Sequence, residues 1–297
     1  MSRTAEEIAT QPACWRRAVE AAAAFDDLPR PGERVAVTGC GTSWFMAIAY
    51  ATLREAAGLG ETDAFASSEF PAGRSYDRVV AITRSGTTTE VLDLLTRLKG
   101  TVPTLALTAD PKTPVMDAAD AVAVLDWADE ESVVQTRFAT TAFAFLRAGL
   151  GHIPGLKTLD EAAVDAELAV TEPLPASVVE AEQWTFLGRG WTYGLALEAA
   201  LKMREAAGAW TESYPAMEYR HGPISITGPG RVAWMFGTLP EGLAADVSRV
   251  GGELVARQES DPLADLIRAQ RLAVALAESR GYDPDHPRNL TRSVILS

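Results

Sequence analysis

Two turns rich in glycine and hydroxyl side chains each follow an apolar strand-like run and precede a helix-like one. The first carries Thr42 and Ser43, and the second carries Thr83, Ser85 and Thr88. Glycines permit tight turns, helix amino ends point N–H groups outward, and hydroxyls add further donors. Ser and Thr are also ordinary helix caps. Because both turns should lie at the carboxyl edge of one parallel sheet, together they favour a phosphate site.

A second group of residues could move protons. Glu198, Lys202 and Glu205 are spaced by four and then three residues, so they share one helix face. Such a face is either a solvated, salt-bridged surface or a site for acid–base chemistry. Of the three histidines, His221 stands in a loop before a Gly-Pro pair, and the other two are expected on the surface: His152 and His286.

These groups stand in a sequence that repeats itself. Arg54-Glu55-Ala56-Ala57-Gly58 recurs as Arg204-Glu205-Ala206-Ala207-Gly208, about 150 residues later. The preceding glycine-rich turn and the following Glu-aromatic pair recur at nearly the same offset. This register indicates a duplicated α/β unit, with a glycine-rich turn opening a helix in each copy. Glu55 is then the counterpart of Glu205 in the first copy, and it is expected to have a structural role only.

Strand-like and helix-like runs alternate along both copies, which is typical of a parallel sheet covered on both faces. Strands are expected at 34–38, 77–83, 101–108, 121–125, 183–187, 232–236 and 253–256. Helices are expected at 15–28, 44–57, 89–98, 193–207 and 262–280, and most of 131–172 is expected to be helical. The domains predicted from this pattern are an N-terminal helix (1–29), a first domain (30–150), a helical linker (151–175) and a second domain (176–297).

Composition narrows the possible functions. The chain has 297 residues, 47% of them apolar, and a net charge of −13. An acidic chain without a basic run is not expected to bind nucleic acid. No apolar run is long enough for a membrane span, and the first residues lack the apolar region of a signal peptide, so neither is expected. Two cysteines without metal-ligand spacing predict neither a metal site nor a disulfide scaffold. The expected location is the cytoplasm.

The motifs together resemble those of the sugar isomerase (SIS) family. The resemblance covers roughly residues 35–297. Within the family, the motifs are similar to those in the isomerase half of glucosamine-6-phosphate synthase and in stand-alone amino-sugar-phosphate deaminases. The runs that carry it are Cys40-Gly41-Thr42-Ser43, Ser68-Glu69-Phe70, Arg84-Ser85-Gly86-Thr87-Thr88, Leu187-Gly188-Arg189-Gly190, Ala200-Leu201-Lys202-Met203-Arg204-Glu205, Arg220-His221-Gly222-Pro223 and Pro287-Arg288-Asn289-Leu290. It implies two tandem SIS domains, each a three-layer, flavodoxin-like parallel sheet flanked by helices.

The resemblance also implies roles for individual residues. Glu205 matches the carboxylate that moves the proton, and Lys202 matches the lysine beside it. His221 matches a histidine that assists ring opening from the neighbouring subunit, so a homodimer with a shared active site is expected. No cofactor is implied. The phosphate of a sugar 6-phosphate would be held by Thr42, Ser43, Thr83, Arg84, Ser85 and Thr88.

Two positions depart from the synthase pattern. Arg292 replaces a lysine of the C-terminal tail, and a guanidinium cannot form a Schiff base with a ketose. Arg292 is therefore expected to hold an anion or an oxyanion. Arg84 stands where the synthase has glutamine and would add positive charge near the phosphate. No glutaminase domain precedes the repeat, so synthesis of an amino sugar from glutamine is not expected.

Three functions are compatible with these residues. The first is an amino-sugar 6-phosphate isomerase or deaminase, in which Glu205 enolises the open-chain sugar and ammonia is released. The second is a lyase or dehydratase, which eliminates the carbon-3 oxygen of an N-acetylamino-sugar 6-phosphate. The third is a sugar-phosphate sensor without turnover, which retention of both Glu205 and His221 disfavours. The choice of sugar is expected to depend on residues 131–136 and on the C-terminal tail.

Overall fold

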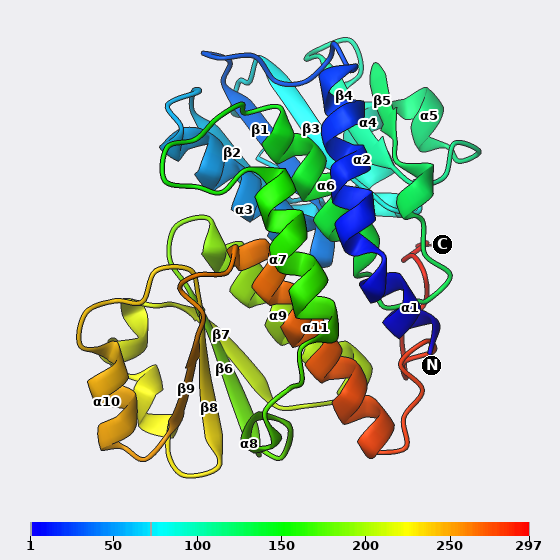
Figure 1. Ribbon diagram of the computed structural model, residues 1–297. Helices are drawn as coiled ribbons and strands as arrows, with labels where there is room; N and C mark the ends of the chain where they lie inside the picture. Colours follow the sequence, from blue (N-terminus) through cyan, green and yellow to red (C-terminus); the bar gives the residue numbers. More distant parts are fainter. Residues whose placement is uncertain (1, 72, 297) are drawn as a thin grey trace. The chain divides into compact units, whose positions relative to one another are not determined.

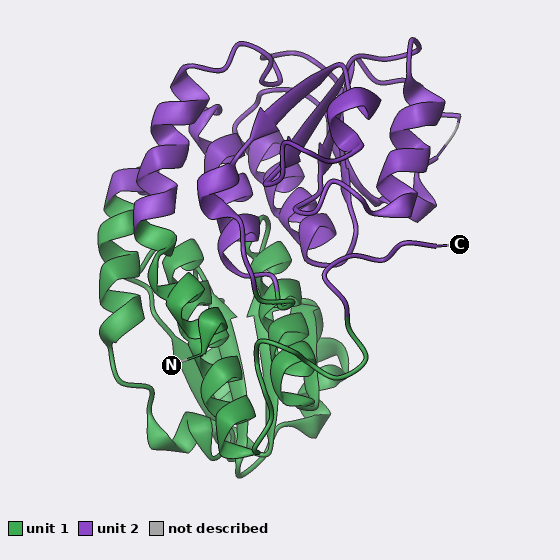
Figure 2. Cartoon of the chain, turned by 90° about the vertical axis from the view of Figure 1, so that its right-hand side faces the viewer, with its two compact units in different colours: residues 1–12, 132–134, 161–290 green, residues 13–131, 135–160, 291–297 purple. Residues whose placement is uncertain are grey.

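The computed structural model describes residues 2–71 and 73–296. The chain divides into two compact units, each with its own parallel sheet (Figure 2). Unit 1 comprises residues 1–12, 132–134 and 161–290, and unit 2 comprises residues 13–131, 135–160 and 291–297. The tail residues 291–297 thus belong with the first copy of the repeat. The domain bounds expected at 30–150 and 176–297 stay predictions for independently folding domains.

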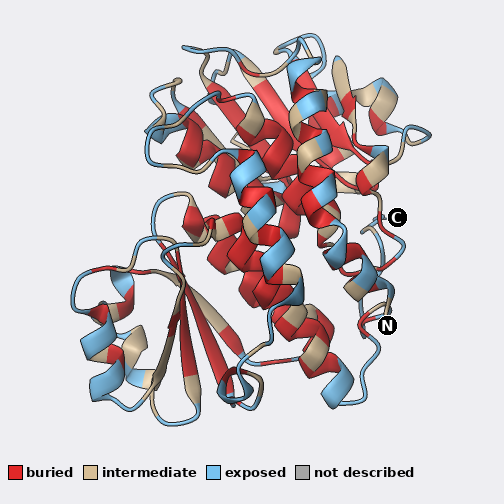
Figure 3. Cartoon of the chain, in the orientation of Figure 1, coloured by how far each residue is buried: buried red, intermediate tan, exposed pale blue. Residues whose placement is uncertain are grey.

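The sheet of unit 2 has five strands in the order β2-β1-β3-β4-β5, all paired in parallel (Figure 1). This is the flavodoxin-like order. The strands are β1 (Val35–Gly39), β2 (Thr62–Ala66), β3 (Arg78–Ile82), β4 (Thr104–Thr108) and β5 (Ala121–Val124). Every residue of β1 and β4 is buried, as expected for strands covered on both faces (Figure 3).

Helices cover this sheet. They are α2 (Gln11–Ala23), α3 (Thr42–Ala56), α4 (Thr89–Leu98), α5 (Val115–Ala118) and α6 (Arg137–Ala148), with short 3-10 turns η1 (Ser67–Glu69) and η2 (Asp126–Ala128). The spacing of Val91 and Leu95 places both on one face of α4, where they pack against Ala81 of β3 and Ala106 of β4. This packing fixes the amino end of α4 at the edge of the sheet where β3 ends.

Unit 1 has a four-stranded parallel sheet in the order β7-β6-β8-β9. Its strands are β6 (Gln183–Gly188), β7 (Thr211–Pro215), β8 (Arg231–Phe236) and β9 (Glu253–Ala256). Its helices are α1 (Arg3–Ala9), α7 (Leu159–Thr171, from residue 161 on), α8 (Ala176–Val179), α9 (Thr192–Ala207), α10 (Leu243–Arg249) and α11 (Pro262–Ser279), with 3-10 turns η3 (Glu218–His221) and η4 (Pro223–Ile226). Leu243 and Val247 of α10 pack on Leu187 and Met235 of the sheet.

The two sheets share one strand order. The run β2-β1-β3-β4 of unit 2 corresponds to β7-β6-β8-β9 of unit 1, as a repeated α/β unit would require, and β5 is additional. The sequence analysis missed β2 and β7, which stand at equivalent places at the sheet edges. β2 carries Thr62 and Asp63 beside three apolar residues, β7 carries Thr211, Glu212 and Ser213, and four of the five residues in each strand are only partly buried. An edge strand covered less completely needs no continuous apolar run, so the pattern that marks the central strands is absent.

Other expectations differ in detail. The N-terminal helix expected at 15–28 is α2, which both starts earlier, at Gln11, and ends earlier, at Ala23, and a separate short helix, α1, precedes it. Pro12 in its first turn is compatible with a helix start, because the N–H that proline lacks has no partner there anyway. In the part of the chain that the structure describes, no helix is long and apolar enough to cross a membrane.

Candidate functional site

The two hydroxyl-rich turns of unit 2 leave the sheet side by side. Gly39, the last residue of β1, pairs in parallel register with Ile82, the last residue of β3. The turns that follow these strands therefore open at the same edge, as the sequence analysis expected. Thr42 and Ser43 form the first turn of α3 and are buried. A Cβ at Gly39 would lie 2.7 Å from Cβ of Ser43, so only glycine allows this close turn.

The second turn is fixed by hydrogen bonds to the neighbouring strand. The carbonyl oxygen of Arg84 accepts from Ala109 N at 3.1 Å and from Thr108 Oγ1 at 3.2 Å. Gly86 adopts a φ of 62°, and a Cβ there would lie 2.0 Å from Thr113 Oγ1. The turn is thus held in one conformation that requires glycine.

The hydroxyls of this turn are gathered before α4. Ser85 Oγ accepts hydrogen bonds from Thr87 N at 3.3 Å and from Thr87 Oγ1 at 3.1 Å. Thr83 Oγ1 is buried and has no hydrogen-bond partner among the described residues. Thr88 is the N-cap residue of α4, and its side chain makes no capping bond. Buried hydroxyls usually find a partner, so Thr83 retains bonding capacity that a ligand could satisfy.

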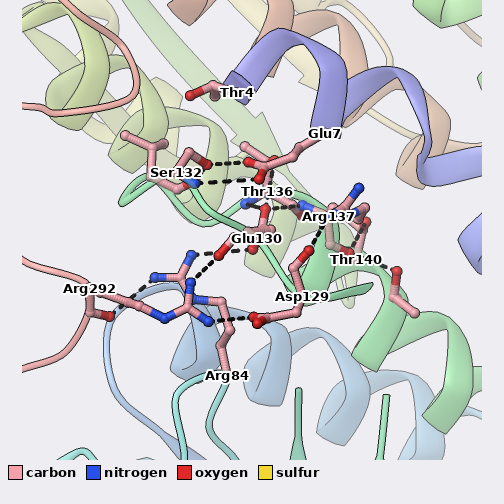
Figure 4. Close-up of polar contacts among 12 residues, drawn as sticks. Thr4, Glu7, Arg84, Asp129, Glu130, Ser132, Thr136, Arg137, Thr140 and Arg292 are labelled. Carbon is pink, nitrogen blue, oxygen red and sulfur yellow. Dashed lines mark hydrogen bonds and ion pairs between the residues drawn. The ribbon is translucent and has the colours of Figure 1, made fainter. Parts of the chain in front are cut away.

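The guanidinium of Arg84 forms an ion pair with a buried carboxylate (Figure 4). Its Nη1 lies 3.3 Å from Oε2 of Glu130, and both side chains are almost completely buried. Oε1 of Glu130 accepts from Thr136 N at 2.6 Å, from Thr136 Oγ1 at 2.9 Å and from Arg137 N at 2.6 Å, which caps the amino end of α6. The positive charge expected beside the phosphate is therefore paired with Glu130, a residue that the sequence analysis did not single out.

Arg292 joins the same cluster through the C-terminal tail. Its guanidinium donates to the carbonyl oxygen of Glu130 and forms an ion pair with Asp129, and its own carbonyl accepts from Nη2 of Arg84 at 3.1 Å (Figure 4). The next tail residues continue onto the turn before α4. Ser293 Oγ lies 3.0 Å from Thr87 Oγ1, and Val294 O accepts from Thr89 N at 3.2 Å. Both departures from the synthase pattern thus belong to one ionic cluster.

In unit 1, α9 carries a buried line of charges. Nζ of Lys202 forms an ion pair with Glu205 and lies 3.5 Å from Oε1 of Glu198. The side chains of Lys202 and Glu198 are inaccessible, whereas that of Glu205 keeps 19% of its surface exposed. The face is therefore not a solvated surface. It presents one carboxylate to solvent over a buried ammonium group.

The equivalent face of α3 has a structural role. Oε1 of Glu55 accepts a hydrogen bond from Thr62 N at 3.0 Å, and Arg54 Nη1 donates to Thr62 Oγ1 at 2.8 Å. Both residues therefore tie α3 to the edge strand β2. The residues at the places of Lys202 and Glu198 are Thr52 and Ile48, so this copy has no ammonium between two carboxylates.

Glu205 lines a cavity within unit 1. The cavity has a volume of about 400 Å³, a size typical of small-molecule sites. Its wall joins the carboxyl end of α9 to the segment after α11. The residues that line it are Arg204, Glu205, Ala206, Gly208, Gly281, Tyr282, Asp283, His286, Pro287, Arg288 and Asn289. Asn289 has a φ of 65°, a conformation that costs energy for most residues and clusters at functional sites.

His221 lies apart from this lining. It ends the 3-10 turn η3 and is exposed. The turn is anchored by its neighbours: Tyr219 is buried, and Arg220 Nε lies 2.8 Å from Oδ2 of Asp246. An exposed histidine on a fixed turn is compatible with the expected contribution to a neighbouring subunit, which stays a prediction. Among the described residues, no group of three or more metal-ligating side chains is arranged to hold a metal ion.

Comparisons of the sequence with known proteins find relatives that share one name, although no family model matches. No protein-family model matches the chain. Glutamine–fructose-6-phosphate aminotransferase of Xanthomonas campestris is 28% identical over 326 residues, covering 91% of this chain and 53% of the relative. The enzyme of the same name from Acidithiobacillus ferridurans is 31% identical over 269 residues, covering 73% of this chain and 44% of the relative. The chain spans about half the length of the curated relatives it matches, and it is a homologue of their isomerase (SIS) domain.

Solved structures share the fold over nearly the whole chain. Glucosamine-6-phosphate deaminase of Thermotoga maritima superposes with a TM-score of 0.81 at 22% identity, covering 99% of this chain and 100% of that one. The C-terminal domain of the Francisella tularensis glucosamine–fructose-6-phosphate aminotransferase gives 0.80 at 20% identity, covering 97% and 98%. Tagatose-6-phosphate ketose/aldose isomerase of Escherichia coli gives 0.77 at 18% identity, covering 100% and 96%. The chain therefore has the α/β fold, with helix-flanked parallel sheets, of phosphosugar isomerases.

Proposed function

We propose that this protein is an amino-sugar 6-phosphate isomerase that acts as a deaminase, with glucosamine 6-phosphate as the model substrate. The observation that carries the proposal is the partly exposed carboxylate of Glu205, which is held by buried Lys202 at the wall of a cavity of about 400 Å³. A carbon-bound proton next to a carbonyl is weakly acidic, so a positioned carboxylate is the group needed to remove it. The equivalent Glu55 lacks this setting, because its carboxylate is bonded to a strand.

The phosphate is assigned to the hydroxyl-rich edge of unit 2. Thr42 and Ser43 stand at the amino end of α3, and Thr83, Ser85 and Thr88 stand before α4. Helix amino ends and hydroxyl donors attract a phosphate dianion. The tail bonds to this edge through Ser293 and Val294, while the preceding tail residues line the cavity of Glu205. In this proposal the hydroxyls of unit 2 bind the phosphate, and Glu205 of unit 1 moves the carbon-bound proton.

The remaining expectations complete the proposal. Two tandem SIS domains are supported by the shared strand order of the two sheets. A homodimer is supported by the exposure of His221, which could complete a partner's site. In this account Arg84 and Arg292 position the C-terminal tail and do not bind the sugar, because the guanidinium groups of both are hydrogen-bonded to Glu130.

One observation favours a lyase as the second candidate. Arg292 occupies the place of the synthase lysine, and its guanidinium is bonded to Asp129 and to the carbonyl of Glu130. This position therefore offers no amine that could form a Schiff base with the sugar. Elimination of a carbon-3 oxygen does not need one, because it requires only a base and a proton donor.

A parallel incubation tests the two candidates. The purified protein is mixed with glucosamine 6-phosphate and, separately, with N-acetylglucosamine 6-phosphate, and both ammonia and product mass are measured. Ammonia together with fructose 6-phosphate supports the deaminase. Loss of one water from the N-acetyl sugar without ammonia replaces it with the dehydratase. Binding of both sugars without turnover would overturn both candidates in favour of a sensor.

A further inference from the structure

The cavity of Glu205 contains an imidazole that the sequence analysis placed on the surface. His286 is largely exposed, but it belongs to the lining together with Tyr282, Asp283 and Arg288. Its Nδ1 lies 3.0 Å from Oδ2 of Asp283. The hydrogen bond from His286 lowers the pKa of Asp283 below its ordinary value, so Asp283 is a carboxylate at neutral pH. A carboxylate only accepts hydrogen bonds, so Nδ1 must carry the donated proton, and Nε2 is the nitrogen left for a ligand.

The segment that carries His286 is held by its neighbours. Asp285 Oδ1 accepts from Thr4 N at 2.8 Å and from Thr4 Oγ1 at 2.7 Å, and Asp285 O accepts from Val133 N at 3.1 Å. Asp285 N donates to Asp283 Oδ1 at 2.9 Å, so the carboxylate that orients the imidazole is itself oriented. This bonded arrangement gives the imidazole a defined place at the cavity wall.

Enolisation needs a second group besides the base. When Glu205 removes the proton from carbon 2, negative charge develops on the carbonyl oxygen at carbon 1, and that oxygen must be stabilised or protonated. The basic side chains in the cavity lining are two arginines and this histidine. Nη1 of Arg204 is bonded to Thr211, and the guanidinium of Arg288 lies over the Tyr282 ring, 4.4 Å from its centre. An arginine side chain in a protein does not give up a proton, whereas an imidazole can donate or accept one, so the histidine is the group suited to general acid catalysis.

We propose that His286, oriented by Asp283, donates a proton to the carbonyl oxygen at carbon 1 of the open-chain sugar while Glu205 moves the carbon-bound proton. This inference rests on the function proposed above. It assigns to the same chain a proton donor distinct from His221, the histidine expected to act at ring opening.

The proton balance closes without any further reactant. Glu205 takes the proton from carbon 2, and the pair of the broken C–H bond forms the C1–C2 double bond. The π pair of the carbonyl moves to oxygen 1, which takes the Nε2 proton of His286. Glu205 then returns its proton to carbon 1 while the C1–C2 π pair forms that bond. The nitrogen lone pair forms the C=N bond of an imine, and the nitrogen proton is lost to neutral His286 through solvent. Water hydrolyses the imine to ammonia and a ketose.

The test compares single variants of the full-length protein on glucosamine 6-phosphate. His286→Asn is expected to lower kcat about 100-fold, since general acid catalysis commonly contributes about 10²- to 10⁴-fold. Asp283→Asn is expected to lower kcat by a smaller factor, because it only orients the imidazole. Binding of glucitol 6-phosphate, which lacks the carbonyl, should remain within about 2-fold of the wild-type Kd in both variants. His152→Asn, which changes a histidine of unit 2, is the matched control with unchanged kcat.

The outcomes separate this inference from the proposed function. A kcat within 2-fold of wild type for His286→Asn, together with an inactive Glu205→Gln, would overturn the role of His286 and leave the function standing. Full activity of Glu205→Gln would overturn the proposed function itself. Loss of glucitol 6-phosphate binding in His286→Asn would show a structural or binding role and also overturn the proposal. A large loss of kcat with unchanged binding supports it.

Discussion

Lys202 is the residue on which the geometry of the carboxylates depends. Its side chain is 1% exposed and stands between Glu198 and Glu205. Lys202→Met removes the cation beside buried Glu198, and breaking a buried ion pair in this way costs about 3–5 kcal/mol. We expect the free energy of unfolding, measured by urea titration, to fall by about 3 kcal/mol. The double variant Glu198→Gln/Lys202→Met should recover part of that loss. A single variant as stable as wild type would contradict this description of the α9 face.

Glu130 makes a second residue-scale prediction, because it serves both Arg84 and the amino end of α6. Glu130→Ala removes two bonds to backbone N–H groups at the helix end, one bond to the Thr136 hydroxyl and the counter-charge of a buried guanidinium. We expect a loss of about 3 kcal/mol in the free energy of unfolding, because cap loss and an uncompensated charge act together. Glu20→Ala, which changes an exposed glutamate of α2 in the same unit, is the control. Equal losses of unfolding free energy in the two variants would show that the contacts of the Glu130 carboxylate do not stabilise the fold.

At the scale of elements, the stability of the amino end of α1 depends on the carboxylate of Asp285, and therefore on pH. Burial raises the pKa of Asp285, but hydrogen bonds from Thr4 and Arg3 outweigh burial and hold the pKa below its ordinary value of 3.8. A carboxylate with a depressed pKa in the folded state stabilises the fold above its unfolded pKa. That contribution is lost as pH falls through the folded pKa. Asp285→Asn should lower the free energy of unfolding by about 1 kcal/mol at pH 6 and by less at pH 3, which lies below the unfolded pKa. Equal losses at both pH values in urea titrations would contradict this.

The elements also show what the sequence could and could not predict. The central strands and α4 were predicted because continuous apolar runs and the spacing of Val91 and Leu95 reflect burial. Strands β2 and β7 were missed because they lie at sheet edges, where polar and apolar residues mix in partly buried positions. The pairing of Arg84 with Glu130, and of Arg292 with Asp129, joins residues far apart in sequence, and no local pattern records such contacts. His286 was expected on the surface for the same reason, since its cavity is formed by the carboxyl end of α9 and the segment after α11, which are far apart in the sequence.

At the scale of the whole molecule, the expected homodimer can be tested through subunit mixing. Glu205→Gln and His221→Ala homodimers should each be inactive if a site takes its carboxylate from one subunit and its histidine from the other. Random exchange between them should restore about a quarter of wild-type activity, because about half of the dimers become mixed and each mixed dimer has one intact site of two. Mixed dimers that form but stay inactive, or a fully active monomer, would contradict the shared site.

The central claim is that Glu205 carries the proton of carbon 2, and an isotope measurement tests it most directly. Glucosamine 6-phosphate with deuterium at carbon 2 is incubated with the wild-type protein, with Glu205→Gln and with Glu55→Gln. We predict that the wild type and Glu55→Gln move the label to carbon 1 or release it to solvent, and that Glu205→Gln leaves it in place. Turnover with the label still on carbon 2, or label loss in Glu205→Gln at the wild-type rate, would contradict the account.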